Sequence, residues 1–299
     1  MRPLRALELF SGLGGWRLAL GGLGQVAAAY DISPPANAAY FANHGQRPLA
    51  KELARVPGSV LAAHGADTWL LSPPCQPFCR MGRHQGLEDP RSRAFLHLMD
   101  CLREAPPEHL ALENVAGFLG SDAHALLGRR LEEAGLHRVE YALCPSTFGL
   151  PNLRPRVYIL ASRRPLAALA APALAPEPVA AFLDAEEDPG LYVPAEVLDR
   201  HWRGLDLVTA EARRTACFIG GYGQKFVGSG SFLETARGVR RFSPGEVARL
   251  LGQGAMRFPD ELTLEQRYRV LGNGLSLPVA RWVVEQLGRA HGPKQEETP

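Results

Sequence analysis

Residues 4–15 read Leu4-Arg5-Ala6-Leu7-Glu8-Leu9-Phe10-Ser11-Gly12-Leu13-Gly14-Gly15, an apolar run that leads into closely spaced glycines. The run predicts a strand, and the glycines predict a tight turn into a helix. Backbone N–H groups at such a helix start can face a ligand, because the small residues let it approach closely. The dinucleotide fingerprint G-x-G-x-x-G would need a glycine at position 17, which is Arg17, so a nicotinamide enzyme is disfavoured.

The alternation of apolar runs and helical patterns continues to residue 162. Further strands are predicted at residues 26–30, 68–71, 110–112, 139–143 and 157–161. Helices are predicted near residues 34–43, 92–104 and 122–134. This order is typical of an α/β, Rossmann-like fold with a mostly parallel sheet.

Regular alternation stops after Arg163, where six prolines occur by residue 194. This Ala/Pro-rich stretch is either a linker or a functional loop. We predict a large domain over residues 1–162, a smaller domain over 163–242, and a C-terminal segment, 243–299, that completes the large domain. In that segment, Ser243-Pro244-Gly245-Glu246 predicts a capped helix start, and residues 278–287 predict a closing amphipathic helix.

The composition is that of an ordinary globular protein, with 299 residues of which 46% are hydrophobic and 21% charged. No run of eighteen apolar residues and no signal-peptide pattern is visible, so we expect a cytoplasmic protein without a membrane partner. Five cysteines form an odd set without a second close pair, which favours reduced thiols over disulfides.

Basic residues are concentrated between positions 200 and 257, where ten Lys/Arg stand against four Asp/Glu. The formal net charge of the chain is only +2, so this local excess says more about partners than the total does. The excess could meet nucleic-acid phosphates. For single residues such as Arg240 and Arg241, a merely solvated surface position is an equal alternative.

Ser72-Pro73-Pro74-Cys75-Gln76-Pro77-Phe78 follows the apolar run 68–71. The two prolines would hold Cys75 on a stiff loop at the carboxyl end of a strand, where ligands collect in open α/β sheets. One alternative is a buried, inert thiol. The sequence disfavours a zinc site formed by Cys75 and Cys79, because such a site needs two further ligands at suitable spacing and no second cysteine pair is present.

Charged side chains follow or precede other predicted strands. Glu113 ends the strand after Cys75 and would present a carboxylate at the same sheet edge, where burial without a task or partner is costly. Arg154 and Arg156 precede the strand 157–161 and could pair with phosphates or a base edge. Asp31 ends the second strand, where it could accept bonds from ribose hydroxyls or cap the next helix.

Five motifs in this order, FSGLGG (10–15), PPCQ (73–76), ENV (113–115), RPR (154–156) and GNGL (272–275), resemble the DNA cytosine-5 methyltransferase family over nearly the whole chain. Within it, the chain is most similar to the branch that methylates tRNA in the anticodon loop, through CFIGGYG (217–223), GSGS (228–231), MGR (81–83) and QRYRVL (266–271). Gly274 stands where the family usually has Ser, and Ile219 where the tRNA branch usually has Thr.

The resemblance implies that residues 1–162 and 243–299 form a catalytic domain that binds S-adenosylmethionine and that 163–242 form a target-recognition domain. It also implies roles for particular residues. The cofactor S-adenosylmethionine would be contacted by Phe10, Leu13, Gly14, Gly15, Asp31, Leu53, Ser72 and Asn273. Cys75 would attack C6 of cytosine, Glu113 would stabilise the charge that builds in the ring, and Arg156 and Arg154 would anchor the base or a phosphate. We further expect nucleic-acid contacts from Gln76, Arg83, Cys217, Phe218, Tyr222, Lys225, Arg240 and Arg241.

The sequence therefore predicts S-adenosylmethionine-dependent C5-methylation of cytosine in tRNA, by a monomer without a metal. A DNA cytosine-5 methyltransferase is the first alternative, since it uses the same catalytic set. The second is a catalytically silent RNA-binding protein on the same scaffold, against which the intact Cys75, Gln76, Glu113 and Arg156 argue.

Overall fold

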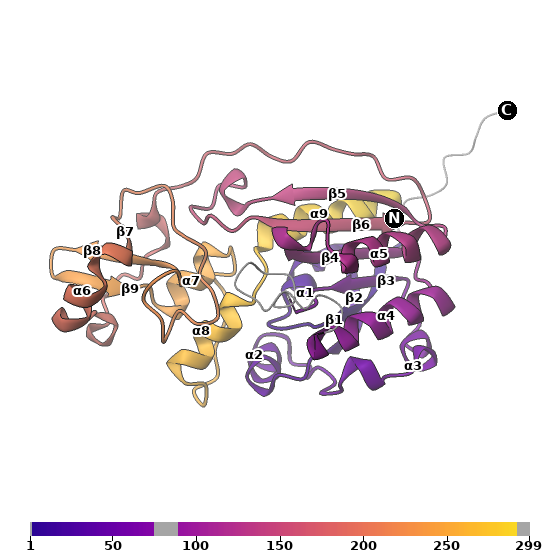
Figure 1. The fold of residues 1–299 in the computed structure, drawn as a ribbon, viewed down its shortest axis with the longest axis horizontal. Coiled ribbons are helices and arrows are strands. Elements are labelled where there is room, and N and C mark those ends of the chain that lie inside the picture. The colour runs from indigo at the N-terminus through magenta and orange to yellow at the C-terminus, as the bar shows by residue number, and fades with distance from the viewer. Residues whose placement is uncertain (1, 75–88, 292–299) are drawn as a thin grey trace.

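The computed structural model describes residues 2–74 and 89–291. Its larger part is built on a six-stranded sheet with the strand order β2-β1-β3-β4-β6-β5 (Figure 1). The strands are β1 (Leu4–Leu9), β2 (Gly24–Tyr30), β3 (Thr68–Leu71), β4 (His109–Val115), β5 (His137–Leu143) and β6 (Arg156–Ser162). Only β6 in this sheet runs opposite to the others, so the α/β class with a mostly parallel sheet is confirmed.

Helices cover both faces of this sheet (Figure 1). One face packs against α1 (Gly15–Leu20) and α9 (Leu277–Ala290), and the other against α3 (Gly58–Ala63), α4 (Arg93–Glu104) and α5 (Asp122–Glu133). Successive strand side chains point to opposite faces, so Leu7 joins the cluster with Leu98 of α4, and Ala6 joins the cluster with Val283 of α9. The apolar runs of β3 and β6 are continuous because both faces of these central strands are buried.

A smaller part of the chain carries the three-stranded sheet β7 (Asp206–Val208), β8 (Ser231–Thr235) and β9 (Gly238–Arg241), next to α6 (Ala195–His201). Residues 163–178 reach it as a long extended segment that passes over the top of the view in Figure 1. Its hydrophobic cluster also includes α7 (Pro244–Leu250), α8 (Leu264–Gly272) and side chains of α2 (Pro34–His44). The two parts are thus joined by a shared core as well as by the chain.

Local capping follows the sequence at several helix starts. Ser243 accepts from the backbone of Glu246, whose side chain accepts from the Ser243 backbone, so the predicted capping box at α7 is confirmed. Ser33 is the N-cap of α2, and the alternative interpretation of Asp31 as that cap is therefore wrong. No helix among the described residues is both long and apolar enough to span a bilayer.

Candidate active site

The glycine-rich turn between β1 and α1 is held in an uncommon backbone shape. Phe10 has φ 60°, a left-handed conformation that is rare for a residue with a bulky side chain. Gly14, at φ 84°, packs so closely that a Cβ there would lie 2.3 Å from His44 Nε2. Around Gly12, at φ 52°, a Cβ would meet nothing within 4 Å, so the turn leaves open space on this side. The space is where a ligand could reach the backbone.

A buried carboxylate fixes the start of α1 from below this turn. Glu8 of β1 accepts hydrogen bonds from the backbone N–H groups of Trp16 and Arg17, at 3.1 and 3.2 Å, and from the Tyr40 hydroxyl at 2.9 Å. Burial raises the pKa of Glu8 to about 7, although these donors and the Arg17 charge oppose the shift. This role was not predicted from the sequence, although Glu8 stands out as an acidic residue between two leucines of a mostly apolar strand.

Asp31 ties the turn to the end of β2. Its Oδ2 accepts from the backbone of Gly12 and its Oδ1 from the backbone of Ser33, both at 2.8 Å. Burial raises the pKa of Asp31 in spite of these two bonds. Each carboxylate oxygen still has a second lone pair, so both could accept from a diol as well. The neighbouring Ile32 side chain is 66% exposed and gives this edge an apolar surface.

One polar atom at the turn has no partner within the described residues. The Ser11 hydroxyl is buried, yet its Oγ makes no hydrogen bond in the part of the chain that the structure describes. An unpaired buried hydroxyl costs free energy, so a polar ligand group at this place would be favourable. Together with the space at Gly12 and the Asp31 carboxylate, it fits a cofactor that carries polar and ribose groups.

The other cofactor residues expected from the sequence differ in their surroundings. Leu13 and Leu53 are buried, and Leu53 belongs to the hydrophobic core beside Tyr30, which favours a packing role. Gly15 packs against Leu275, with 3.0 Å between its virtual Cβ and Leu275 Cβ. Asn273 ends α8 and is exposed.

Glu113 and Arg156 meet at the end of β4. Arg156 Nε lies 3.2 Å from Glu113 Oε1, and the two side chains are only 16% and 10% exposed. Burial raises the pKa of Glu113, while Arg156, Arg154 and a hydrogen bond from Ser72 oppose the rise. The carboxyl can therefore hold a proton at a higher pH than an exposed glutamate, which suits a proton donor or a sharer of a proton.

The loop that leads to Cys75 is anchored on both sides. Trp16 Nε1 donates to Ser72 Oγ at 3.0 Å, and Asn114 Nδ2 donates to the Pro73 carbonyl at 3.2 Å. These two bonds fix the chain at the carboxyl end of β3, directly beside the Glu113 strand. Cys75 itself, Gln76, Cys79 and Arg83 lie outside the described residues. Their assignments remain predictions from the sequence.

Arg154 joins three segments instead of presenting its charge to solvent. It is 3% exposed, and its guanidinium donates to the carbonyls of Phe218 at 3.1 Å, Gly272 at 3.0 Å and Gly274 at 2.8 Å. It also donates to Cys217 Sγ at 3.3 Å. These bonds use the N–H groups of both terminal nitrogens, which favours a positioning role for Arg154 and leaves only its Nε–H for the base-anchoring role expected from the sequence.

Two of the sequence motifs meet backbone to backbone. A Cβ at Gly272 would lie 2.1 Å from the nitrogen of Gly220, so no larger residue fits between the GNGL and CFIGGYG segments. Cys217 lies between Arg154 and Arg156. Burial would raise the pKa of its thiol, but the two guanidinium groups outweigh burial and lower it.

The residues expected to contact nucleic acid are divided by burial. Phe218 and Tyr222 are 2% and 0% exposed and form part of the small-domain core, which disfavours direct contact. Arg240 is 3% exposed and pairs with both carboxylate oxygens of Glu246, so its charge is used internally. Arg241 lies with its guanidinium 4.2 Å from the centre of a phenylalanine ring and is partly exposed, and Lys225 is exposed. Among the expected cationic residues that the structure describes, Arg241 and Lys225 remain accessible to a phosphate.

One group of side chains has the composition of a cation site within the described residues. It consists of Glu108, His109 and His291, at the end of β4 away from Glu113. His109 Nε2 and His291 Nδ1 are 2.7 Å apart, a hydrogen-bond distance. Two imidazole nitrogens on one tetrahedral zinc would lie about 3.3 Å apart. The pair is therefore described better as a hydrogen bond between the sheet and α9.

The comparison with known families agrees with this arrangement. The family of C-5 cytosine-specific DNA methylases matches residues 4–187, which is more than half of the chain. The chain belongs to this cytosine-C5 methyltransferase family.

Relatives of this methyltransferase match over nearly their full length. The human protein named tRNA (cytosine(38)-C(5))-methyltransferase is 30% identical, over 96% of this chain and 100% of its own. The protein of the same name from Schizosaccharomyces pombe is 31% identical, over 96% of this chain and 97% of its own. The crystal structure of the S. pombe Dnmt2 methyltransferase superposes with a TM-score of 0.83 at 29% identity, and covers 96% of this chain and 99% of that chain.

Proposed function

We propose that this methyltransferase transfers a methyl group from S-adenosylmethionine to C5 of a cytosine in tRNA. The observation that carries the proposal is the pairing of Glu113 with Arg156 beside the anchored loop that leads to Cys75. The printed names of the human and S. pombe relatives, which match along almost the whole chain, support tRNA as the substrate.

The glycine-rich turn would hold the cofactor, which supplies an electrophilic methyl group when bound. The Asp31 carboxylate would accept from the ribose hydroxyls, and the unpaired Ser11 hydroxyl would bond to a polar group of the same molecule. Ile32 would provide the apolar surface for the adenine ring. Glu8 would act indirectly, because it holds the start of α1 and so the backbone of the turn.

The catalytic residues would act on the base in sequence. Attack of the Cys75 thiolate on C6 pushes electron density towards C5 and N3, and Glu113 donates or shares a proton at N3. The activated C5 takes the methyl group, after which loss of the C5 proton and release of the thiolate restore the ring. Arg156 would hold the base carbonyl, since its guanidinium already lies beside Glu113. A base must leave its stack to enter such a site.

The choice between tRNA and DNA can be tested directly. We expect tritiated-methyl transfer to a tRNA anticodon stem-loop to be far faster than to duplex DNA at the same salt concentration, because a loop cytosine is already partly unstacked. Bisulfite sequencing of cellular tRNA and genomic DNA, with and without the protein, would give the same comparison in cells. Equal or faster labelling of duplex DNA would overturn the tRNA proposal and leave the cytosine chemistry standing.

A further inference from the structure

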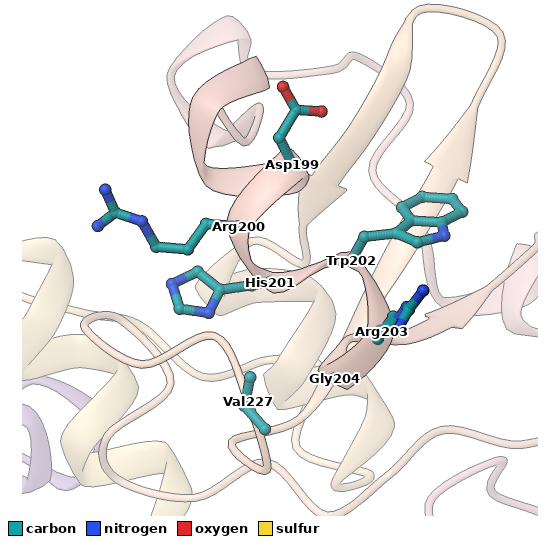
Figure 2. A pocket seen from close by; sticks show the side chains of 7 residues that line it. All are labelled: Asp199, Arg200, His201, Trp202, Arg203, Gly204 and Val227. Atoms are coloured by element: carbon teal, nitrogen blue, oxygen red, sulfur yellow. The ribbon is translucent and has the colours of Figure 1, made fainter.

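The last residues of α6 and the turn that follows it form a cavity on the smaller part of the chain. It is lined by Asp199, Arg200, His201, Trp202, Arg203, Gly204 and Val227, and has a volume of about 290 Å³ (Figure 2). The Trp202 side chain is 54% exposed and Val227 is 53% exposed. Figure 2 shows Trp202 and Arg203 on one side of the turn and Arg200 and His201 on the other. The exposed indole therefore has Arg203 on its own side of the turn and Arg200 on the opposite side.

The wall of this cavity is built on packed rings. The His201 ring stacks on Phe226 with centroids 5.6 Å apart and planes 10° apart, and the Arg241 guanidinium lies 4.2 Å from the Phe226 centroid. Gly204 lets Val227 close against the turn, since a Cβ there would lie 2.8 Å from Val227 Cγ2. These contacts hold the turn in place without covering Trp202.

The arginines of the turn differ from others nearby. Arg214 and Arg249 bind carboxylates, those of Asp206 and Asp184, and Arg240 binds Glu246. Across residues 2–74 and 89–291, neither Arg200 nor Arg203 takes part in an ion pair, and both are exposed. Their charges are thus available to an anion. Asp199 is the acidic residue of the cavity, and in Figure 2 it points away from Arg200 and His201.

We propose that this cavity is a second nucleotide-binding site, in which an unpaired RNA base stacks on Trp202 while Arg200 and Arg203 bind the adjoining phosphates. The assignment rests on the proposed function in tRNA and adds a contact outside the catalytic centre. An exposed aromatic ring with flanking cations fits a splayed-out base, because every base offers a flat face and every linkage a negative charge. Bases inside a duplex are already stacked on each other, so the site selects unpaired nucleotides.

The test measures binding of an unmodified tRNA to the full chain by fluorescence anisotropy. We expect Trp202→Ala to weaken binding about tenfold and Trp202→Phe to retain most of the affinity, since stacking needs only an aromatic face. Arg200→Ala combined with Arg203→Ala should flatten the dependence of log affinity on log salt by about one to two. Asp199→Asn should strengthen binding slightly. Phe41→Ala, which removes an exposed ring from the large domain, is the matched control and should bind as the parent does.

The kinetic readout separates this site from the catalytic centre. Trp202→Ala should raise KM for tRNA and leave kcat unchanged at saturating RNA, and its affinity for S-adenosylmethionine should equal that of the parent. Unchanged tRNA binding by Trp202→Ala would overturn the nucleotide site while the tRNA proposal stands. If Trp202→Ala weakens the binding of a duplex competitor as much as it weakens the binding of tRNA, the proposed preference for unpaired bases is wrong. If the parent chain methylates duplex DNA and binds no tRNA, the proposed function and this site both fail.

Discussion

Arg156 contacts Glu113 across the antiparallel pair of β4 and β6, with 3.2 Å between Nε and Oε1. In the register of these strands Arg156 faces Val115, so Glu113 is its diagonal neighbour on the same face of the sheet. Burial raises the pKa of Glu113 and the Arg156 charge lowers it, with burial the larger effect. If Arg156 forms a hydrogen bond to a bound base, its charge should lower the pKa of Glu113 less. Glu113 would then be protonated more readily when the base is bound and a proton donor is needed.

Glu113→Gln should reduce the rate of methyl transfer at saturating cofactor and tRNA by about 100-fold, because an amide cannot transfer a proton to N3. The raised pKa of Glu113 predicts that activity carried by its proton falls as the pH rises through that pKa. A pH–rate profile of the variant should lack this alkaline decrease. Glu261→Gln, at an exposed position, is the control and should leave the profile unchanged. A Glu113→Gln variant with the parent's rate and profile would exclude proton donation by this residue.

Cys75→Ala should abolish methyl transfer while cofactor affinity stays near that of the parent, because in the proposed mechanism the thiolate forms the covalent bond to C6 and need not hold the cofactor. Transfer of labelled methyl groups and titration calorimetry with S-adenosylmethionine measure the two effects. Cys79→Ala, Cys101→Ala and Cys144→Ala should each retain activity. Substantial turnover by Cys75→Ala would refute the assignment of the nucleophile.

The sequence predicted the centre of the sheet well because strands such as β3, β4 and β6 contain short apolar runs buried on both faces. It also predicted that Glu113 would lie at the carboxyl end of a strand. It could not predict the partner of Glu113, since Arg156 meets it only because β6 inserts antiparallel between β4 and β5. The order of strands in a sheet depends on the whole fold, and the local sequence pattern of a strand does not predict it.

Burial of charged residues was the other limit of the sequence argument. Arg240 was expected at a surface, yet both of its terminal nitrogens bind Glu246, the residue that also caps α7. The capping motif was readable from Ser243 to Glu246, but its extension to an arginine on β9 depends on how that strand packs against the helix. Likewise, no sequence pattern around Arg154 predicts the three carbonyl groups to which it donates hydrogen bonds.

Asp31→Ala should weaken S-adenosylmethionine binding by about 10- to 100-fold, because charge-assisted hydrogen bonds contribute about 1.5–3 kcal/mol each. The loss would combine bonds to the ribose with the bond that holds Gly12. Titration calorimetry measures the affinity, and thermal unfolding without cofactor reports whether the turn still folds. Unchanged affinity in a folded variant would mean that Asp31 serves only the backbone of the turn.

Arg154→Ala should lower the free energy of unfolding by about 2–4 kcal/mol, because three buried carbonyl groups lose a charged donor. Arg154→Lys should recover only part of the loss, since an ammonium group does not reproduce the planar fork of donors. Urea unfolding measures both, with the exposed Arg129→Ala as a control expected to change little. Full stability of Arg154→Ala together with a loss of tRNA affinity would restore the anchoring role.

The hydrogen bond between His109 Nε2 and His291 Nδ1 joins the sheet to the residue after α9, and we expect it to make the stability of the fold sensitive to acid. Burial, and next the positive charge of His291, lower the pKa of His109 to about 4, against about 6.5 in an unfolded chain. Arg164 acts in the same direction, and Asp67 opposes it. The unfolded chain therefore binds more protons than the folded chain between these values, and the stability contributed by neutral His109 is lost as the pH falls from about 6.5 towards 4.

We expect urea unfolding of the parent chain to show a larger loss of stability between pH 7 and pH 5 than His109→Gln, by about 1–2 kcal/mol. The glutamine can keep a hydrogen bond to His291 but cannot take up a proton in this range. The pKa values of Glu8 and Glu113 are raised, so these residues add stability as the pH falls. They do so in the parent and in His109→Gln alike, and the difference between the two proteins therefore reports on His109. His124→Gln, at a histidine on α5 that is paired with Glu140, serves as the matched control and should follow the parent. If His109→Gln loses as much stability as the parent over this interval, the histidine pair does not control the acid response.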